Sequence, residues 1–393
     1  MFSSARIGEF PHLKAGSSKT ILIISGETSG DVHGGNLALA LHRMQPGLRL
    51  LGVGGPRMAA AGVELIEDNR EMGVIGVWEV ISHLRAIQRA YSRVVQVLCS
   101  GEVDLVVLID YPDFNFRVAH LAHRKNIPIV YYISPQIWAW RSGRIKTLQK
   151  LIQQMIVILP FEKELYQQSG IPCEFVGHPL LDEVQTALDK KEVLRSFRLD
   201  PGHPVIGLLP GSRTKEVKKI LPLMLAAMAK TDQKVPGIQL VLALAPSIVR
   251  DEVLTIASRW PLNVRIIEGE TDRVIAASDL VLVASGTATL QAAILETPMV
   301  ILYRLAWLTY LLGRILIKVD HIGLVNLVAG KRIVPELLQS EATPDRIADQ
   351  VQGMLLDIPR REAIKKELAQ VRSRLGTPGA SQRAAEVILR HVV

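Results

Sequence analysis

Short apolar runs alternate along most of the chain with longer stretches in which apolar residues recur at the period of a helix. The short runs are typical of buried β-strands, and the longer stretches are typical of amphipathic helices. Strands that alternate with helices predict βα units around parallel sheets. The expected strands form two series: 20–25, 50–54, 104–110, 127–133 and 155–159, followed by 204–209, 238–244, 264–268, 280–284 and 299–303.

A polar stretch without clear periodicity, 182–202, separates the two series of strands, and from residue 343 onward the pattern is helical only. Two similar α/β halves favour the GT-B architecture, in which two Rossmann-like domains face each other across a cleft and ligands lie beyond the carboxyl ends of the strands. The predicted organisation is a loose extension at 1–18, Rossmann-like domains at 19–185 and 200–342, and a helical C-terminal tail at 343–393.

The composition is that of a folded, slightly apolar enzyme, with 48% hydrophobic and 5% aromatic residues among 393. The low aromatic content and the lack of RNP-type or zinc-finger motifs argue against nucleic acid as a partner. The net charge of +8 favours anionic partners, for which phosphorylated substrates and an anionic lipid surface are the candidates. Basic residues are densest in 360–374, where a solvated helix face explains them equally well.

The sequence predicts no metal site, no bound cofactor and no membrane span. Cys99 and Cys173 are far apart and in no metal-binding spacing, which suits a reducing cytoplasm. A dinucleotide fingerprint fails because Arg57 stands where its third glycine is needed. The most apolar stretch, 305–316, is too short to span a bilayer, and residues 1–18 lack the apolar core of a signal or anchor. We therefore expect a cytoplasmic protein.

One candidate phosphate-binding loop follows the first strand of the second series. It contains Gly211, Ser212 and Arg213 and leads into a helical pattern. Gly211 lets backbone N–H groups approach a ligand, Ser212 can cap the helix, and Arg213 offers a charged fork for phosphate. A helix cap followed by a solvated arginine is the alternative interpretation.

A second candidate loop follows the strand at 280–284 and contains Ser285, Gly286 and Thr287. Small hydroxyl residues around a glycine at the start of a helix form an anion-binding nest. Capping alone explains either hydroxyl residue by itself. Two such loops at the ends of different strands nevertheless favour a pyrophosphate between them.

Acidic residues follow two strands of the first series. Asp110 and Asp113 stand at the end of the third strand, where a carboxylate lies at the rim of the expected cleft and can act as a general base. Their spacing is not the DxD that holds a metal-bound sugar nucleotide, so no cation is required. Each could instead serve as a turn residue or helix cap. Glu27 and Ser29 follow the first strand and are candidates for acceptor contacts, with a tight turn as the alternative.

Nine segments, with their order and spacing kept from about residue 20 to 350, resemble the lipid-A-disaccharide synthase family. They are GETSGD at 26–31, GGPRM at 54–58, IDYPDFN at 109–115, SPQIWAWR at 134–141, LPFE at 159–162, GHPL at 177–180, LLPGSR at 208–213, ASGTATL at 284–290 and NLVAGK at 326–331. The resemblance implies an inverting glycosyltransferase that joins UDP-2,3-diacylglucosamine to 2,3-diacylglucosamine 1-phosphate. The products would be UDP and the β-1,6-linked lipid A disaccharide 1-phosphate. No cofactor is implied, and a homo-oligomer is left open.

The resemblance also implies roles for single residues. Asp110 is the first choice for the base on the acceptor hydroxyl and Asp113 the second. Arg213, helped by the second loop, would hold the leaving pyrophosphate, and Asn326 would lie near the substrates. Gln291 stands where the family commonly has a glutamate for the donor ribose hydroxyls, so the charge-assisted part of that hydrogen bond is absent.

The segment 72–84 predicts contact with the inner face of the inner membrane of a Gram-negative-type bacterium. Its apolar residues cover more than one helical stripe and are Val74, Val77, Trp78, Ile81 and Leu84. Arg85, Arg89 and Arg93 follow and suit anionic headgroups, and both implied substrates carry acyl chains. We predict reversible peripheral binding there, against the alternative of a core helix with a wide apolar face.

Two other functions fit parts of the pattern. A UDP-sugar 2-epimerase of the same architecture would use the same nucleotide loops without a lipid acceptor, and the apolar segment 72–84 counts against it. A non-catalytic protein that binds lipid or nucleotide would not need Asp110 or Arg213.

Overall fold

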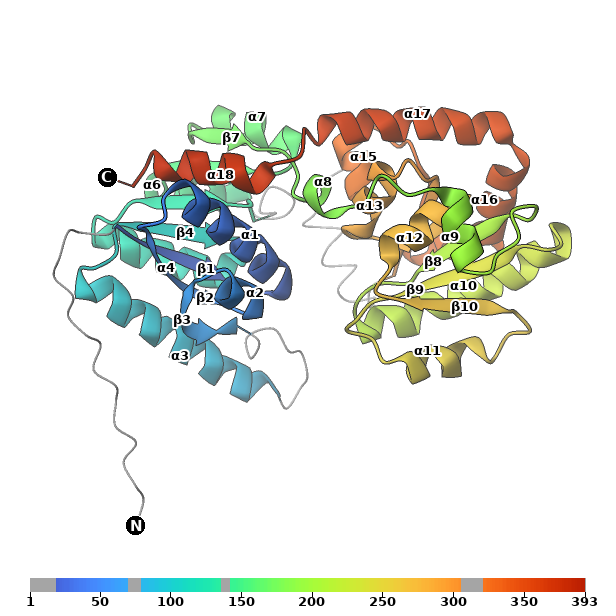
Figure 1. Cartoon of the computed structure of the whole chain (residues 1–393), viewed down its shortest axis with the longest axis horizontal. Coiled ribbons are helices and arrows are strands. Elements are labelled where there is room, and N and C mark those ends of the chain that lie inside the picture. The colour runs from blue at the N-terminus through green and yellow to red at the C-terminus, as the bar shows by residue number, and fades with distance from the viewer. Residues whose placement is uncertain (1–18, 70–78, 136–141, 305–320, 393) are drawn as a thin grey trace, which may run out of the picture. The chain divides into compact units, whose positions relative to one another are not determined.

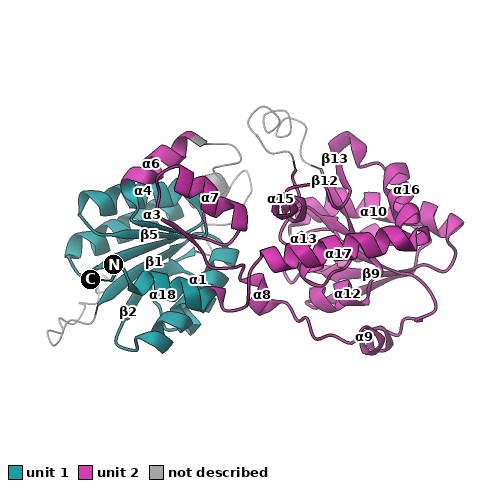
Figure 2. Cartoon of the chain, turned by 90° about the horizontal axis from the view of Figure 1, so that it is seen from above, with its two compact units in different colours: residues 1–133, 151–155, 381–393 teal, residues 134–150, 156–380 magenta. Residues whose placement is uncertain are grey.

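The computed structural model describes residues 19–69, 79–135, 142–304 and 321–392 (Figure 1). The chain forms two compact units (Figure 2), of which unit 1 comprises Met1–Ile133, Leu151–Met155 and Ser381–Val393, and unit 2 comprises Ser134–Lys150 and Ile156–Ala380. The expected extension at 1–18 and the apolar stretch 305–316 lie outside the described residues.

The first sheet has seven strands in the order β3-β2-β1-β4-β5-β6-β7, and the pairs from β3 to β5 are parallel. Its strands alternate with helices along the chain. The elements are β1 Thr20–Ser25, α1 Thr28–Met44, β2 Arg49–Gly54, α2 Pro56–Ala60, β3 Glu64–Asp68, α3 Glu79–Ser100, β4 Leu105–Ile109, α4 Pro112–Arg124, β5 Ile129–Tyr132, η2 Ser142–Arg144, α6 Ile145–Leu151, β6 Gln154–Val157, α7 Pro160–Gln168, β7 Cys173–Phe175, α8 Leu180–Glu183 and α9 Lys190–Ser196.

The inner strands of this sheet are apolar runs because both of their faces are covered. Every residue of β1 and β4 is buried, which is the rule for parallel sheets with helices on both faces. In the register of these two strands Ser25 pairs with Ile109. The loops that follow β1 and β4 therefore leave the sheet side by side.

The second sheet has six strands in the order β10-β9-β8-β11-β12-β13, all in parallel pairs. Leu208 of β8 pairs with Leu282 of β11, so the loops after these two strands also leave the sheet side by side. The elements are β8 Val205–Leu209, α10 Thr214–Lys234, β9 Gln239–Leu244, α11 Arg250–Ala257, β10 Val264–Glu268, α12 Thr271–Ala277, β11 Leu280–Ala284, α13 Ala288–Ile294, β12 Met299–Tyr303, α15 Leu324–Ala329, β13 Glu336–Leu338 and η3 Gln339–Glu341.

The end of the chain is helical, as the sequence predicted, with α16 Pro344–Leu356, α17 Ile358–Arg374 and α18 Ala380–Leu389. Thr343 and Asp357 cap α16 and α17 with their side chains, and each helix has a proline in its first turn. Helix α17 runs across unit 2 and contacts α13, α15 and α16 (Figure 2). From Ser381 onward the chain belongs to unit 1.

Every strand predicted from the apolar runs is present, with small differences at the ends. Three further strands, β3, β7 and β13, were not predicted. β3 has the sequence ELIED, in which three acidic residues hide the strand pattern, and it lies at the edge of the sheet. β7 and β13 have only three residues each, too few to show a periodicity.

Candidate functional site

Asp110 directly follows β4 and adopts a backbone conformation that residues other than glycine rarely take. Its φ is 43° and that of Tyr111 is 45°, both in the left-handed region. Residues held in sparsely populated backbone conformations cost about 1–3 kcal/mol each and persist only where neighbouring groups fix them. Two such residues in succession mark the end of β4 as a candidate site.

Two buried side chains hold this strained turn. The carbonyl oxygen of Asp110 accepts hydrogen bonds from Asn115 Nδ2 at 2.7 Å and from the Tyr131 hydroxyl at 2.6 Å. The amide of Asp110 donates to the carbonyl oxygen of Ile133 at 3.2 Å. Asn115 and Tyr131 are both fully buried. They therefore act as positioning residues for Asp110.

The pKa of Asp110 is raised to about 6, chiefly by burial and next by the charge of Glu27, against a lowering by the backbone hydrogen bond with Tyr111. A carboxylate with this pKa is mostly ionised at pH 7 and is a stronger base than an ordinary aspartate. The electrostatics of Asp110 thus suit general base catalysis near neutral pH.

The loop after β1 lies against the Asp110 turn. Gly26 makes room for the ring of Tyr111, because a Cβ at this glycine would lie 2.1 Å from a ring carbon. Asn69 Nδ2 donates to the carbonyl oxygen of Glu27 at 3.4 Å and so helps to fix this loop. The loop brings the charge of Glu27 close enough to affect Asp110.

Glu27, Ser29 and Asp113 are exposed on the same edge of the first sheet. Asp113 lies in the first turn of α4. The pKa of Tyr111 is raised first by burial, next by Glu27 and then by Asp113. The structure therefore brings Glu27 and Asp113 close to the turn formed by Asp110 and Tyr111, and Asp110 is less exposed than either. Ser29 lies in the first turn of α1.

In unit 2, Arg213 stands immediately before α10 and its side chain is 71% exposed. Its guanidinium pairs with Glu216 at 3.1 Å. Gly211 has φ +114°, and a Cβ at this glycine would lie 2.6 Å from the Glu216 carboxylate. The carbonyl oxygen of the exposed Ser212 accepts from Ser247 Oγ at 2.6 Å. The loop is therefore fixed through its backbone while the guanidinium stays accessible.

The Ser285–Thr287 loop lies beside this one because β8 and β11 are neighbours. The Ser285 amide donates to the carbonyl oxygen of Leu302 at 3.0 Å. A Cβ at Gly286 would meet nothing within 4 Å, and Thr287 is exposed with no side-chain cap hydrogen bond. Open space, small residues and a neighbouring arginine are what a phosphate group requires.

Gln291 lies in α13 and is half-buried. Its Nε2 donates to Asp272 at 3.3 Å, and the other oxygen of Asp272 accepts from the backbone of Gln185 at 3.2 Å. Burial raises the pKa of Asp272, against a lowering by the bond from Gln185. A carboxylate therefore lies in direct contact with the amide of Gln291.

Asn326 is fully buried and uses both atoms of its amide inside unit 2. Nδ2 donates to the carbonyl oxygen of Val334 at 3.0 Å and to Glu336 at 2.7 Å. Oδ1 accepts from the amides of Ile333 at 2.9 Å and Val334 at 3.1 Å. These contacts fix the chain between α15 and β13, so they make Asn326 a positioning residue here.

A model of the lipid-A-disaccharide synthetase family matches residues 21–391. The chain belongs to this family. It is 46% identical to the lipid-A-disaccharide synthase of Syntrophus aciditrophicus, over 95% of this chain and 98% of that protein. It is 44% identical to the lipid-A-disaccharide synthase of Geobacter sulfurreducens, over 95% of this chain and 97% of that protein. As a family member the chain is a glycosyltransferase of lipid A disaccharide synthesis.

Solved structures share the fold at low sequence identity. A UDP-GlcNAc 2-epimerase from Neisseria meningitidis bound to UDP-GlcNAc has a TM-score of 0.65 at 15% identity, over 94% of this chain and 100% of that one. The glycotransferase of kitacinnamycin has a TM-score of 0.63 at 17% identity, over 95% and 99%. These likenesses show the α/β GT-B fold that the sequence predicted, and the function rests on the family.

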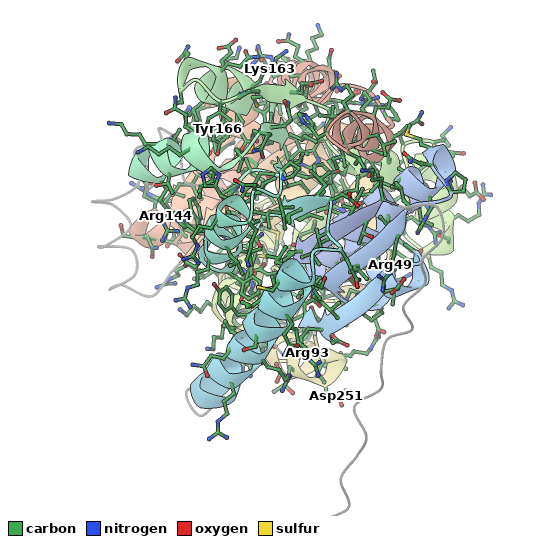
Figure 3. All side chains as sticks on the ribbon, turned by 90° about the vertical axis from the view of Figure 1, so that its left-hand side faces the viewer. Arg49, Arg93, Arg144, Lys163, Tyr166 and Asp251 are labelled. Carbon is green, nitrogen blue, oxygen red and sulfur yellow. The ribbon has the colours of Figure 1, made fainter. Side chains whose placement is uncertain are left out.

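The predicted membrane segment falls largely outside the described residues. Val74, Val77 and Trp78 lie there, and Ile81 and Leu84 lie in α3 at positions whose side chains are not described. The following arginines of α3, Arg85, Arg89 and Arg93, are exposed. Figure 3 labels Arg93 beside α3. No helix in the described part of the chain is long and apolar enough to cross a membrane.

Three positioning residues were not singled out from the sequence. Asn115 and Asp31 lie inside matched motifs, and Tyr131 lies in a buried strand. Asp31 is buried, and its carboxylate accepts from the amides of Gly55 at 2.8 Å, Arg57 at 3.0 Å and Met58 at 3.0 Å. For Asn115 and Asp31, membership in a matched motif was the available signal. Their roles could not be predicted because the partners of Asp31 are distant in sequence and those of Asn115 depend on the turn.

Proposed function

We propose that the chain transfers the diacylglucosaminyl group of UDP-2,3-diacylglucosamine to the 6-hydroxyl of 2,3-diacylglucosamine 1-phosphate, with Asp110 as the base. Membership in the lipid-A-disaccharide synthetase family supports the reaction. The single observation that supports the base is the raised pKa of Asp110, about 6, on a strained turn held by Asn115 and Tyr131.

In the proposed step the acceptor oxygen attacks the anomeric carbon of the donor on the face opposite UDP. The new O6–C1 bond forms as the bond from C1 to the phosphate oxygen breaks, so the configuration inverts. The proton of the 6-hydroxyl moves to the carboxylate of Asp110, and UDP leaves with the bonding electron pair. Asp110 must be ionised before the step, which its pKa permits at pH 7.

Asp113 is the second candidate for the base. It is exposed in the first turn of α4, whereas Asp110 is half-buried. Burial favours Asp110, because desolvation of a carboxylate raises its pKa and makes it a stronger base. We assign Glu27, directly before α1, and Ser29, in the first turn of α1, to contacts with the acceptor.

The leaving pyrophosphate is assigned to unit 2. Arg213 offers an exposed guanidinium, and a planar guanidinium can donate two parallel hydrogen bonds to a phosphate. The backbone of Gly211 and Ser212 and the open loop at 285–287 complete the proposed nucleotide site. Gln291, in contact with Asp272, is assigned to the ribose hydroxyls.

The substrates of this reaction carry acyl chains, so the enzyme must meet a membrane without crossing it. We assign reversible binding at the inner face of the inner membrane to Val74, Val77, Trp78, Ile81 and Leu84. The exposed arginines that follow in α3 support this assignment, because basic residues beside an apolar segment attract anionic headgroups.

Incubation of the purified protein with both diacylated substrates tests the proposal. We expect a disaccharide 1-phosphate and UDP in equal amounts, with the same rate in EDTA. If the acceptor is left out and the products are UDP and a 2-epimerised sugar, the protein is instead an epimerase. The absence of any product, with UDP still bound, would indicate a binding protein.

A further inference from the structure

The basic stretch at 360–374 forms most of α17, and its cations have different surroundings. Arg374 donates to the carbonyl oxygens of Val328 and Ala329 at the end of α15. Arg372 pairs with Glu296 at 3.3 Å, and Lys365 with Glu362 at 2.8 Å. Arg360 instead lines a cavity of about 620 Å³ within unit 2. The beginning of the stretch is therefore exposed, as the solvated-face interpretation predicts, and it also borders a cavity.

This cavity lies among α16, α17 and the chain between α15 and β13. Its cations are Lys331, Arg332 and Arg360, and its lining contains one carboxylate, that of Glu367. Apolar lining is supplied by Ile333, Val334, Pro335, Ala363 and Ile364. None of the residues assigned to the reaction lines it. Its volume is in the range of small-molecule sites.

The cations of the cavity are exposed, and each makes a contact within the protein. Lys331 pairs with Glu367 at 2.8 Å, Arg332 donates to the carbonyl oxygen of Glu336 at 2.7 Å, and Arg360 donates to Gln350 at 3.2 Å. A guanidinium has five N–H groups, and these contacts use one in each arginine. The two guanidinium groups therefore keep further donors for a ligand.

The backbone under the cavity is rigid. The amides of Ile333 and Val334 are both bound by the buried Asn326. Asp357 accepts from the amide of Arg360 at 2.9 Å and so fixes the start of α17. A cavity with a rigid frame, excess positive charge and an apolar lining matches an anionic group attached to an apolar body.

We propose that this cavity is a second ligand site, separate from the reaction site, which binds a phosphate monoester carried on an apolar body, such as phosphatidic acid. Lys331 and Arg360 bind the phosphate, and the accessible apolar lining at Ile333, Pro335 and Ala363 contacts the apolar part. The proposal does not rest on the assignment of Asp110 or Arg213.

Calorimetric titration of the full chain with dihexanoylphosphatidic acid, below its micelle concentration, tests this site. The test variant is Lys331→Gln with Arg360→Gln. The matched control is Arg361→Gln with Lys365→Gln, which removes the same charge from residues that do not line the cavity. Charge-assisted hydrogen bonds are worth enough that we expect the test variant to bind at least about tenfold more weakly, with the control unchanged.

Two further ligands identify what the cavity recognises. Dihexanoylphosphatidylcholine and inorganic phosphate should both bind the unmodified chain much more weakly than dihexanoylphosphatidic acid. Equal affinity for inorganic phosphate would overturn the role of the apolar lining. Equal loss in the test and control variants, or no loss in either, would overturn the site. UDP affinity and the unfolding transition are measured on every variant and must match those of the unmodified chain. If the double variant does not fold, the single variant Arg360→Gln replaces it.

Discussion

The turn after β4 and the loop after β8 occupy similar places, each directly after an inner strand, yet they are stabilised in opposite ways. The turn at Asp110 is strained, half-buried and held by two buried side chains. The loop at Arg213 carries a side chain that is 71% exposed and held by one ion pair to Glu216. Asp110 is therefore held in place by the fold, whereas the guanidinium of Arg213 is accessible.

The difference follows from what each group must do. A base needs both an accurate position and a raised pKa, and only burial in a rigid frame provides both. A cation that binds a pyrophosphate meets a ligand whose own charge and oxygens order the side chain. Substitutions in the two units should therefore have different effects. Those in unit 1 should lower turnover, and those in unit 2 should lower ligand affinity.

The largest expected effect is that of Asp110→Asn. The variant keeps the size of the side chain but cannot accept the proton, so we expect turnover to fall on the order of 10² to 10⁴ while KM and UDP affinity stay close to normal. Steady-state kinetics with both substrates measure this, with Asp113→Asn as the matched control. Near-normal turnover in the Asp110 variant, or a larger loss in the control, would move the base to another residue.

The same variant should gain stability. The pKa of Asp110 is about 6 in the folded chain against an ordinary 3.8, so ionisation favours the unfolded state as pH rises between these values. The amide that replaces the carboxyl group cannot ionise, and we expect the variant to unfold less readily at pH 7 by on the order of 1–3 kcal/mol. The gain should disappear below pH 3.8, where Asp110 is protonated in both states. Denaturant unfolding at several pH values measures the difference in free energy of unfolding between the variant and the unmodified chain. A difference that did not change with pH would show that the pKa of Asp110 is not raised in the folded chain.

Arg213→Ala should act on affinity. Loss of a charge-assisted contact costs about 1.5–3 kcal/mol, so we expect UDP to bind roughly ten- to a hundredfold more weakly, with little change in stability because the side chain is exposed. Glu216→Gln is the matched control, since it frees the guanidinium and should leave UDP affinity equal or higher. Calorimetric titration with UDP decides between this role and a solvated cap, which would leave the affinity unchanged.

Tyr131→Phe should have a smaller effect confined to turnover. The substitution removes one hydrogen bond to the carbonyl oxygen of Asp110 and keeps the buried ring. A loosened base costs roughly tenfold in turnover through misplacement, and we expect KM and UDP affinity to be unchanged. A general loss of stability with a proportional loss of UDP binding would show that Tyr131 supports the fold alone.

The smallest expected effect is a shift of the pH profile. Activity should rise with pH through about 6 as Asp110 ionises. Glu27→Gln removes a negative charge that raises the pKa of Asp110, so the acidic limb of the pH profile should move to lower pH. The ratio of activity at about pH 5 to activity at pH 7 should therefore be a few-fold higher in the variant than in the unmodified chain. An unmoved limb would separate Glu27 from the base. Ser29→Ala, which changes no charge, should leave the pH position of the limb unchanged.

The sequence by itself determined the architecture and the family. Inner strands such as β1 and β4 are covered on both faces, so they must be apolar runs, and such runs can be read without any tertiary information. The matched motifs follow strand ends, which is why Asp110, Arg213 and the loop at 285–287 could be named as candidates. β3 could not be predicted, because its edge position tolerates the acidic residues that hide its pattern.

Only the tertiary structure decided how these candidates are held. The left-handed turn at Asp110 depends on Tyr131, which is distant in sequence and adjacent only because β4 pairs with β5. The burial that raises the pKa of Asp110 and the full internal use of Asn326 are likewise properties of packed neighbours. Local pattern specifies which face of an element is apolar, whereas hydrogen-bond partners and desolvation depend on chain segments that meet only after folding.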